Sequence, residues 1–146
     1  MFKHILISTD GSAVSHRAAK AGVALARALG AKVTAYRAVE SLDPLYVEGY
    51  AFDQTVIDRA DKRLREAGQK HVDAIGKMAR VAGVRFASVV MNASSAYEGI
   101  INTAKKQKCD LIFMASHGRR GISRLLMGSV TQQVLTHTKI PVVVYR

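Results

Sequence analysis

The sequence predicts an α/β fold in which helices cover both faces of a parallel sheet. Segments with a strand pattern alternate with segments of helical periodicity along the whole chain. The strand segments are continuous apolar runs rich in Val, Ile and Leu, without the strict alternation of a half-exposed sheet. Such strands are buried on both faces, and parallel neighbours need a crossover helix between them. We therefore expect the order β-α-β-α-β-α-β-α-β.

In the first half of the chain, the apolar run HILIS (4–8) predicts the first strand. The turn TDGS leads into a helix over about 12–29, where small and apolar residues recur at helical spacing. Gly30 suits the left-handed residue that ends many helices. KVTAYRAV (32–39) predicts the second strand, and a loop with Pro44, Gly49 and two tyrosines follows to about residue 54.

The second half begins with a long charged amphipathic helix over about 55–82, which we expect to stop at Gly83. VRFASVVM (84–91) predicts the third strand, followed by a helix to about residue 107. DLIFMAS (110–116) predicts the fourth strand. A short helix to His137 and the closing strand PVVVY (141–145) complete the chain. Two capping boxes are predicted at the starts of these last two helices, Ser95 with Glu98 and Ser129 with Gln132.

Composition bounds the class of protein. The 146 residues, 49% of them hydrophobic, suit one globular domain over 1–146. No apolar run is long enough to span a bilayer, and the N-terminus enters a strand pattern without a signal-peptide core, so we expect a cytoplasmic protein. The single cysteine, Cys109, excludes an internal disulfide and is expected to be a buried, unreactive side chain.

The net charge of +11 favours anionic partners, either nucleotides or nucleic acid. Acidic residues alternate with the basic ones in the helical segments, and no basic tail or recognition-helix motif occurs. We therefore expect most of this charge to be solvated surface, and we do not expect nucleic-acid binding.

Parallel α/β sheets bind ligands beyond the carboxyl ends of their strands, where the strand order reverses. Three segments of this chain converge there: Ser8 to Ser12, Val39 with Glu40, and the stretch MASHGRRGISRLLMGSV (114–130). Glycine loops and helix N-termini offer backbone N–H groups to phosphates. The alternative is that the glycines only turn the chain, that Ser129 only caps its helix, and that Asp10 is only a turn or N-cap residue.

Other catalytic and cofactor motifs are absent from the sequence. The five histidines, His117 among them, show no metal-ligand spacing, and no Cys/His cluster accompanies them. A G-x-S-x-G elbow, a Walker A loop and a G-x-G-x-x-G fingerprint are also missing. We expect no catalytic residues and no bound metal of the protein's own.

The chain resembles the universal stress protein family over essentially its whole length. The resemblance rests on ILISTDGS, on CDLIFMASHGRRGISRLLMGSVTQQVL and on the closing IPVVVY. The nucleotide-binding branch of that family carries a Gly-x2-Gly-x9-Gly-Ser/Thr motif after the fourth strand. Gly118 and Gly128-Ser129 match it here, with Arg119 to Met127 as the spacer, whereas the first position is Ala115. If that position requires a positive φ, the extra methyl costs on the order of 1 kcal/mol, which weakens binding several-fold without abolishing it.

The resemblance implies a Rossmann-like, five-stranded parallel sheet in the order 3-2-1-4-5. It also implies that the protein binds ATP or ADP, with or without Mg²⁺. Asp10 would contact the adenosine, the backbone of Val39 would line the adenine pocket, and the glycine loop would hold the ribose and phosphates. The nucleotide-binding residues implied in this way are Ser8, Thr9, Asp10, Val39, Met114, Ala115, Gly118, Arg119, Gly128, Ser129, Val130 and Thr131.

The family also implies a homodimer. The closing strand is short, apolar and uncharged, and as an edge strand it invites pairing with a second copy. The predicted interface residues are Pro141, Val142, Val143, Val144 and Tyr145.

Two functions remain open from the sequence. The first is a dimeric, nucleotide-binding stress-response protein with a regulatory or protective role. It has no evident general base and no paired carboxylates, so it would be at most a slow ATPase. The second is a dimeric stress protein that binds no nucleotide and acts through protein partners. A phosphoacceptor domain is rejected because only Asp10 follows the first strand and the third ends at Met91-Asn92.

Overall fold

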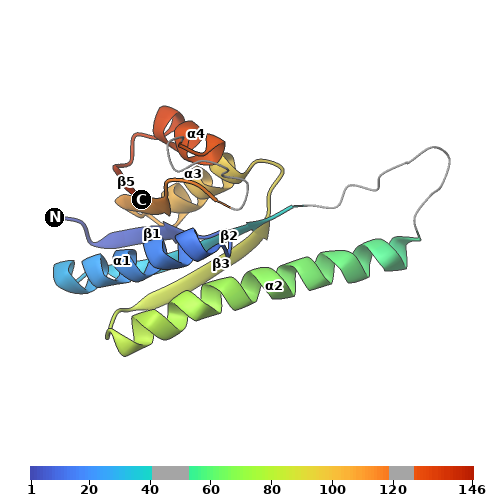
Figure 1. Cartoon of the computed structure of the whole chain (residues 1–146), viewed down its shortest axis with the longest axis horizontal. Helices are drawn as coiled ribbons and strands as arrows, with labels where there is room; N and C mark the ends of the chain where they lie inside the picture. Colours follow the sequence, from blue (N-terminus) through green and yellow to red (C-terminus); the bar gives the residue numbers. More distant parts are fainter. Residues whose placement is uncertain (41–52, 119–126) are drawn as a thin grey trace.

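The computed structural model describes residues 1–40, 53–118 and 127–146, which contain five strands and four helices in alternation (Figure 1). The strands form one sheet in the order β3-β2-β1-β4-β5, and every neighbouring pair is parallel. The predicted fold class and strand order are therefore confirmed. The elements are β1 His4–Ser8, α1 Ala13–Leu29, β2 Lys32–Val39, α2 Gln54–Val81, β3 Phe86–Asn92, α3 Ala96–Lys106, β4 Leu111–Ala115, α4 Ser129–His137 and β5 Val142–Tyr145.

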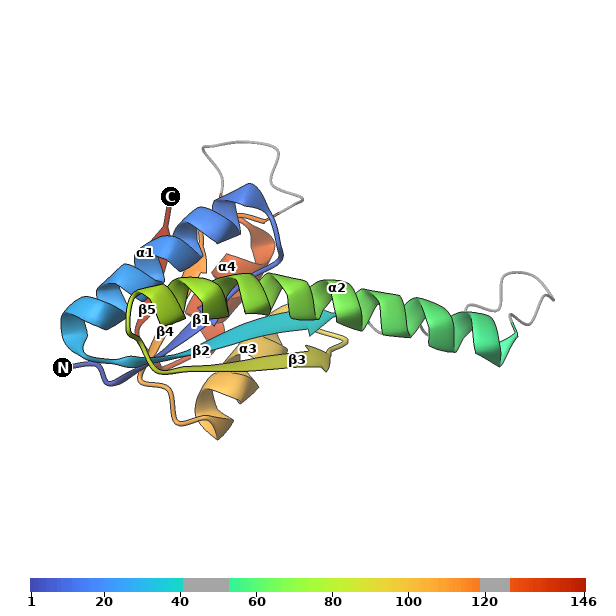
Figure 2. The same cartoon turned by 90° about the horizontal axis from the view of Figure 1, so that it is seen from below.

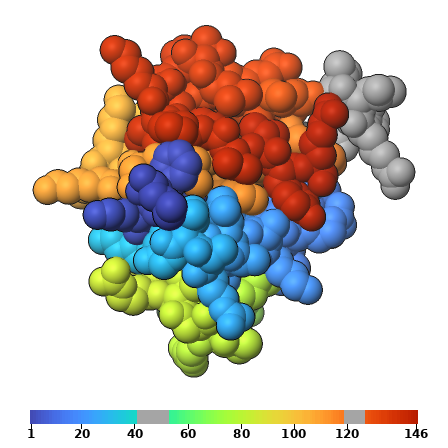
Figure 3. Space-filling model, turned by 90° about the vertical axis from the view of Figure 1, so that its left-hand side faces the viewer, coloured from blue at the N-terminus to red at the C-terminus, as the bar shows by residue number. Residues whose placement is uncertain are grey.

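The sheet separates two hydrophobic layers. On one face, α1 and α2 pack against Ile5, Ile7, Val33 and Phe113. On the opposite face, α3 and α4 enclose a second cluster that contains Leu6 and Tyr36. Figure 2 shows α1 and α2 side by side over the sheet. In Figure 3 the red C-terminal segments and the yellow-green end of α2 lie on opposite sides of the N-terminal segment.

The helix ends follow from local hydrogen bonding. Ser12 caps α1 because its Oγ accepts from the Ser15 N–H at 3.2 Å, and Gly30 ends the helix with φ +65°. Gly83 has φ +70° beyond α2, and the Val84 N–H donates back to the Ala79 carbonyl at 2.8 Å. Val84 thus still belongs to the helix end, which is why β3 begins later than predicted.

Both predicted capping boxes are wrong. Ser95 occupies the N-cap of α3, but its side chain makes no capping hydrogen bond. The N-cap of α4 is Gly128, so Ser129 is already helical, and the Gln132 side chain donates to the Met127 carbonyl instead (3.3 Å). Both boxes were predicted from spacing alone, which does not determine which residue adopts the extended N-cap conformation.

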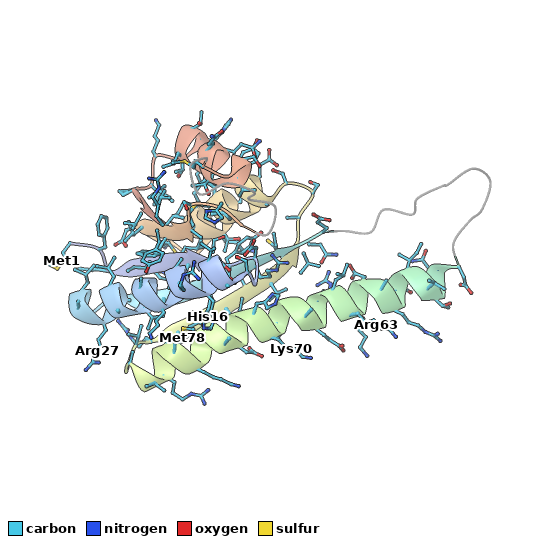
Figure 4. All side chains as sticks on the ribbon, viewed as in Figure 1. Met1, His16, Arg27, Arg63, Lys70 and Met78 are labelled. Carbon is cyan, nitrogen blue, oxygen red and sulfur yellow. The ribbon has the colours of Figure 1, made fainter. Side chains whose placement is uncertain are left out.

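Helix α2 is much longer than the strands that it covers. Its 28 residues span about 42 Å, and its N-terminal half continues past the ends of the strands (Figure 1). Its buried residues start only at Gly68. In Figure 4, the labelled Arg63 and Lys70 lie on the outer side of this helix, away from the sheet.

Two further expectations can be compared with the described residues. Cys109 is buried, and burial raises the pKa of its thiol to about 12, which is consistent with an unreactive side chain. Among the described helices, none is both long enough and apolar enough to cross a membrane.

Candidate functional site

The loops after β1 and β4 meet at the carboxyl edge of the sheet. These strands are parallel neighbours, and the strand order reverses between them. The Asp10 carboxylate lies directly against Gly118, and a Cβ built on Gly118 would collide with Oδ2 of Asp10. A glycine at position 118 is therefore what lets the β4 loop approach the acidic residue.

The turn between β1 and α1 is held by its own side chains. The Thr9 hydroxyl accepts from the Gly11 N–H at 3.1 Å and is bonded to the Ser15 hydroxyl at 3.0 Å. Asp10 Oδ1 accepts from the Ser12 N–H at 2.9 Å. Asp10 is therefore a turn residue but not the N-cap of α1, and its position is fixed before any ligand binds.

His71 of α2 reaches this turn, which no sequence pattern indicated. Gly11 has φ +79°, and a Cβ on it would collide with the His71 imidazole. The contact ties the middle of α2 to the loop that carries Asp10. His71 lies four residues before Ile75, on the apolar side of this amphipathic helix, but the pattern does not show that its imidazole would meet the turn after β1.

Helix α4 begins beside the same loop. The Gly128 N–H donates to the Ser116 carbonyl at 2.7 Å, and a Cβ on Gly128 would lie 3.2 Å from the Cα of His117. Intrahelical bonding starts with the Gln132 N–H, which donates to the Gly128 carbonyl at 3.0 Å. The N–H groups of 129–131 belong to the first turn, where a helix provides no acceptors, and that turn carries no acidic residue.

The side chains of this first turn differ in what they can offer. Thr131 is buried, and its hydroxyl donates to the Ala115 carbonyl at 3.0 Å. That bond ties α4 to the end of β4 and leaves the Thr131 oxygen only as an acceptor. The Ser129 residue is exposed. Any anion at this helix start would thus meet backbone N–H groups and the Ser129 hydroxyl.

Ala115, which replaces the first glycine of the motif, fits its position without strain. It is the last residue of β4, and among the described residues only Lys108 and three glycines have a positive φ. Its side chain belongs to the hydrophobic cluster on the α1 face of the sheet, together with Phe113. The conformational cost considered for this methyl group therefore does not arise.

The peptide groups of Val39 face β3. Its carbonyl accepts from the Ala93 N–H at 3.0 Å. The Tyr36 carbonyl accepts from the Thr9 N–H and faces β1. Successive residues of a strand direct their N–H and C=O groups to opposite sides. Ala38 therefore presents these groups on the β1 side, just past the end of β1. The backbone role implied for Val39 stays a prediction, and its peptide groups point to the β3 side of β2.

Most of the predicted residues converge at this edge. Ser8 ends β1, and Thr9 and Asp10 follow it; Met114 and Ala115 end β4, and 128–131 start α4. Met114 is buried in the cluster on the α3 face, which limits it to supporting the site. Arg119, with its neighbours Arg120 and Arg124, lies outside the described residues.

We expect Ala115→Gly to lower the stability of the fold without improving nucleotide affinity. The change removes a buried methyl and frees the backbone of a strand residue, which together cost about 1 kcal/mol. Chemical denaturation and calorimetric titration with ATP measure the two effects separately. A gain in affinity of severalfold would show that the methyl faces the ligand after all.

The fold and the site define a class. This is a Rossmann-like α/β domain with a glycine-rich loop and an uncapped helix start at the point where the strand order reverses. Residues 1–146 match the universal stress protein family, and the chain belongs to that family. The resemblance seen in the sequence is confirmed.

Relatives are similar over the whole chain. Universal stress protein MJ0531 of Methanocaldococcus jannaschii is 34% identical, over 100% of this chain and 83% of its own length. A universal stress protein of Thermus aquaticus is 30% identical over 100% of both chains.

Solved structures share the fold. MJ0577 of Methanocaldococcus jannaschii superposes with a TM-score of 0.83 at 24% identity, over 99% of this chain and 95% of that one. A universal stress protein in complex with cAMP has a TM-score of 0.72 at 21% identity, over 99% and 97%. The Archaeoglobus fulgidus universal stress protein in complex with dAMP has a TM-score of 0.60 at 17% identity, over 100% and 98%.

Proposed function

We propose that this protein binds an adenine nucleotide between the β1 and β4 loops and acts as a regulatory or protective factor in the stress response. The observation that carries the proposal is the contact of Gly118 with Asp10 beside the helix start at Gly128. It places a carboxylate, a glycine without side-chain bulk and a set of helix N–H donors at one edge. The cAMP and dAMP complexes of two structural neighbours support an adenine ligand.

Each part of the nucleotide has a matching group in this proposal. The phosphates bind at the start of α4, where N–H donors and the helix dipole favour negative charge. Gly118 approaches the ribose and phosphates, and Asp10 accepts a hydrogen bond from the adenosine. The adenine lies near the backbone of Ala38. Ser8, Thr9, Met114 and Ala115 shape the floor of the site.

The ligand is ATP or ADP, with Mg²⁺ carried by the phosphates. Phosphoryl transfer requires a positioned nucleophile and metal ligands, and Asp10 already holds the turn through the Ser12 N–H. We therefore expect hydrolysis to be slow relative to binding, so that the nucleotide serves as a signal carried by the protein.

The test is a titration with ATP, ADP and cAMP followed by calorimetry and by thermal unfolding. Saturation at about 100 times the dissociation constant should stabilise the fold by roughly 2.7 kcal/mol. Asp10→Ala should weaken ATP binding about tenfold, because a charge-assisted hydrogen bond is lost. Asp73→Ala removes an exposed carboxylate of α2 and should leave the affinity unchanged. An unshifted unfolding curve at millimolar nucleotide would favour the non-nucleotide alternative.

We also propose that two copies pair through β5. Ile112 donates to the Pro141 carbonyl and Ser116 to the Tyr145 carbonyl, so the odd-numbered residues of β5 face β4. Val142 and Val144 therefore direct their backbone groups outward. Antiparallel pairing of two such strands would close a two-fold dimer.

Val144→Pro should shift the protein from dimer to monomer. Proline removes one outward N–H and leaves the bonds to β4 intact. Val143 is less suitable for this test because its side chain packs against the core. Sedimentation velocity at several concentrations measures the shift. A dimer that survives Val144→Pro would exclude β5 as the interface.

A further inference from the structure

The opposite edge of the sheet presents a row of backbone groups. The Arg85 carbonyl accepts from the Val33 N–H, and the Ala93 N–H donates to the Val39 carbonyl, so the odd-numbered residues of β3 face β2. The even-numbered residues face outward. Within the described part of the chain, no element pairs with this side of β3, which ends the sheet. The residues whose backbone N–H and C=O groups face outward are Phe86, Ser88, Val90 and Asn92.

This edge lacks the features that usually prevent strand pairing. Its seven residues, FASVVMN, contain no charged residue and no proline. The register with β2 is continuous over all seven, without a bulge. Charged residues, prolines or bulges normally protect the edge strands of soluble proteins from pairing. A seven-residue edge without them is suited to accept another strand.

The α2 side of the edge is hollow and basic. A cavity of about 490 Å³ opens between the C-terminal half of α2 and the start of β3. At its floor the Phe86 ring packs directly against Gly76, where a Cβ would lie 2.8 Å from the ring. The residues that line it are Asp73, Gly76, Lys77, Arg80, Val84 and Phe86.

The charge at this hollow is positive. Lys77, Arg80 and the adjacent Arg85 are all exposed. The one carboxylate, that of Asp73, accepts a hydrogen bond from the Gln69 side chain at 2.8 Å, which directs it along α2. An acidic side chain placed beside the start of β3 on this side would therefore meet two or three cations, whereas at the other end of β3 the Asn92 side chain already donates to the Asp61 carboxylate (2.9 Å).

The other side of the edge is apolar. Ala87 and Met91 point away from α2, and both are exposed, Met91 to 38%. Val89 lies between them and is partly buried against the α3 cluster. A strand added here would thus have one acidic face and one apolar face.

We propose that the β3 edge binds an extended segment of a partner protein in which acidic and apolar side chains alternate. The outward N–H and C=O groups of β3 hold its backbone, as in other cases of strand addition. Lys77 and Arg80 select the acidic face, and Ala87, Val89 and Met91 cover the apolar one. A second copy is the poorer occupant, because neither of its edge strands, β3 or β5, carries an acidic side chain that could meet Lys77 and Arg80.

The probe is a fluorescein-labelled peptide of about eight residues in which Glu and Val alternate. We expect its fluorescence anisotropy to rise with protein concentration and the midpoint to move higher with added salt. A peptide of the same composition with the four Glu and four Val in separate blocks should bind much more weakly. Unchanged anisotropy at about 1 mM protein would overturn the proposal.

Two variants locate the binding. Ser88→Pro removes one outward N–H without touching the bonds to β2 and should weaken binding about fivefold. The double change Lys77→Glu with Arg80→Glu should weaken it at least about tenfold. The matched control is Arg17→Glu with Lys20→Glu, two exposed cations of α1, which should change the affinity by less than about twofold. Equal losses in both double variants would mean non-specific attraction and would overturn the site.

The remaining outcomes are also decisive. If Ser88→Pro lowers the sedimentation coefficient in the absence of peptide, a second copy occupies the edge and the proposal is wrong. Thermal unfolding of each variant confirms that it folds. The test does not depend on the nucleotide, because the β3 edge and the β1–β4 crevice are separate and ATP can be omitted.

Discussion

Gly118→Ala should weaken ATP binding by at least about tenfold, equivalent to roughly 1.4 kcal/mol. The new Cβ would occupy the position of Asp10 Oδ2, so the carboxylate or the β4 loop must move. Either movement separates the two halves of the proposed site. Isothermal titration calorimetry with ATP measures the effect, and thermal unfolding shows whether the variant remains folded.

Gly30→Ala is the matched control for this change. Gly30 lies between α1 and β2, where a Cβ meets no atom within 4 Å, while its φ of +65° makes alanine unfavourable. The control should lose about 1 kcal/mol of stability and keep its affinity for ATP. If Gly118→Ala binds ATP as well as Gly30→Ala does, the nucleotide does not lie between Asp10 and Gly118.

Gly99→Ala should lower the free energy of unfolding by about 2 kcal/mol. A Cβ on Gly99 would overlap the hydroxyl of Tyr36, which is 1% exposed beneath α3. Burial raises the pKa of this hydroxyl, and the neighbouring Thr103 offsets the rise only in part. The collision is therefore with a buried hydroxyl. It outweighs the gain of up to about 1 kcal/mol that alanine brings to a helix interior.

Tyr36→Phe should restore most of the stability lost in Gly99→Ala, because it removes the atom in conflict. A double-mutant cycle from urea denaturation gives the coupling, which we expect to exceed about 1 kcal/mol. Gly76→Ala is the helical control, since its Cβ meets the partly exposed Phe86 ring, which can turn. Additive effects of the Tyr36 and Gly99 changes would contradict the packing described.

The elements of the fold could be predicted because each is marked by a local pattern. HILIS and LIFMA are buried on both faces, and Gly30 and Gly83 end their helices in the left-handed conformation, as expected. The strand order could be predicted only from the family resemblance, because the apolar pattern of a strand does not show which strands lie beside it in the sheet. The capping boxes failed because several polar or small residues compete for each N-cap, and spacing does not choose among them.

The candidate site could be predicted as a set of loops but not in its detailed geometry. Asp10, Gly118 and Gly128 converge as their positions at strand ends suggested. The sequence could not show that the peptide groups of Val39 face β3 and those of Ala38 face the β1 side, because that direction depends on the register with β1 and β3. His71 was missed because its contact with Gly11 joins residues sixty positions apart in the chain.

The two uncharged margins of the sheet give the overall charge of the chain a role in solubility. Neither β3 nor β5 carries a charged side chain, and β5 is paired in the proposed dimer, so repulsion between dimers whose chains each carry +11 must keep the remaining β3 margins from pairing. At 1 M salt the Debye length falls to about 3 Å and that protection is lost. Because pairing through one margin leaves the other open, association would then continue into fibres of folded molecules rather than stop at a closed particle.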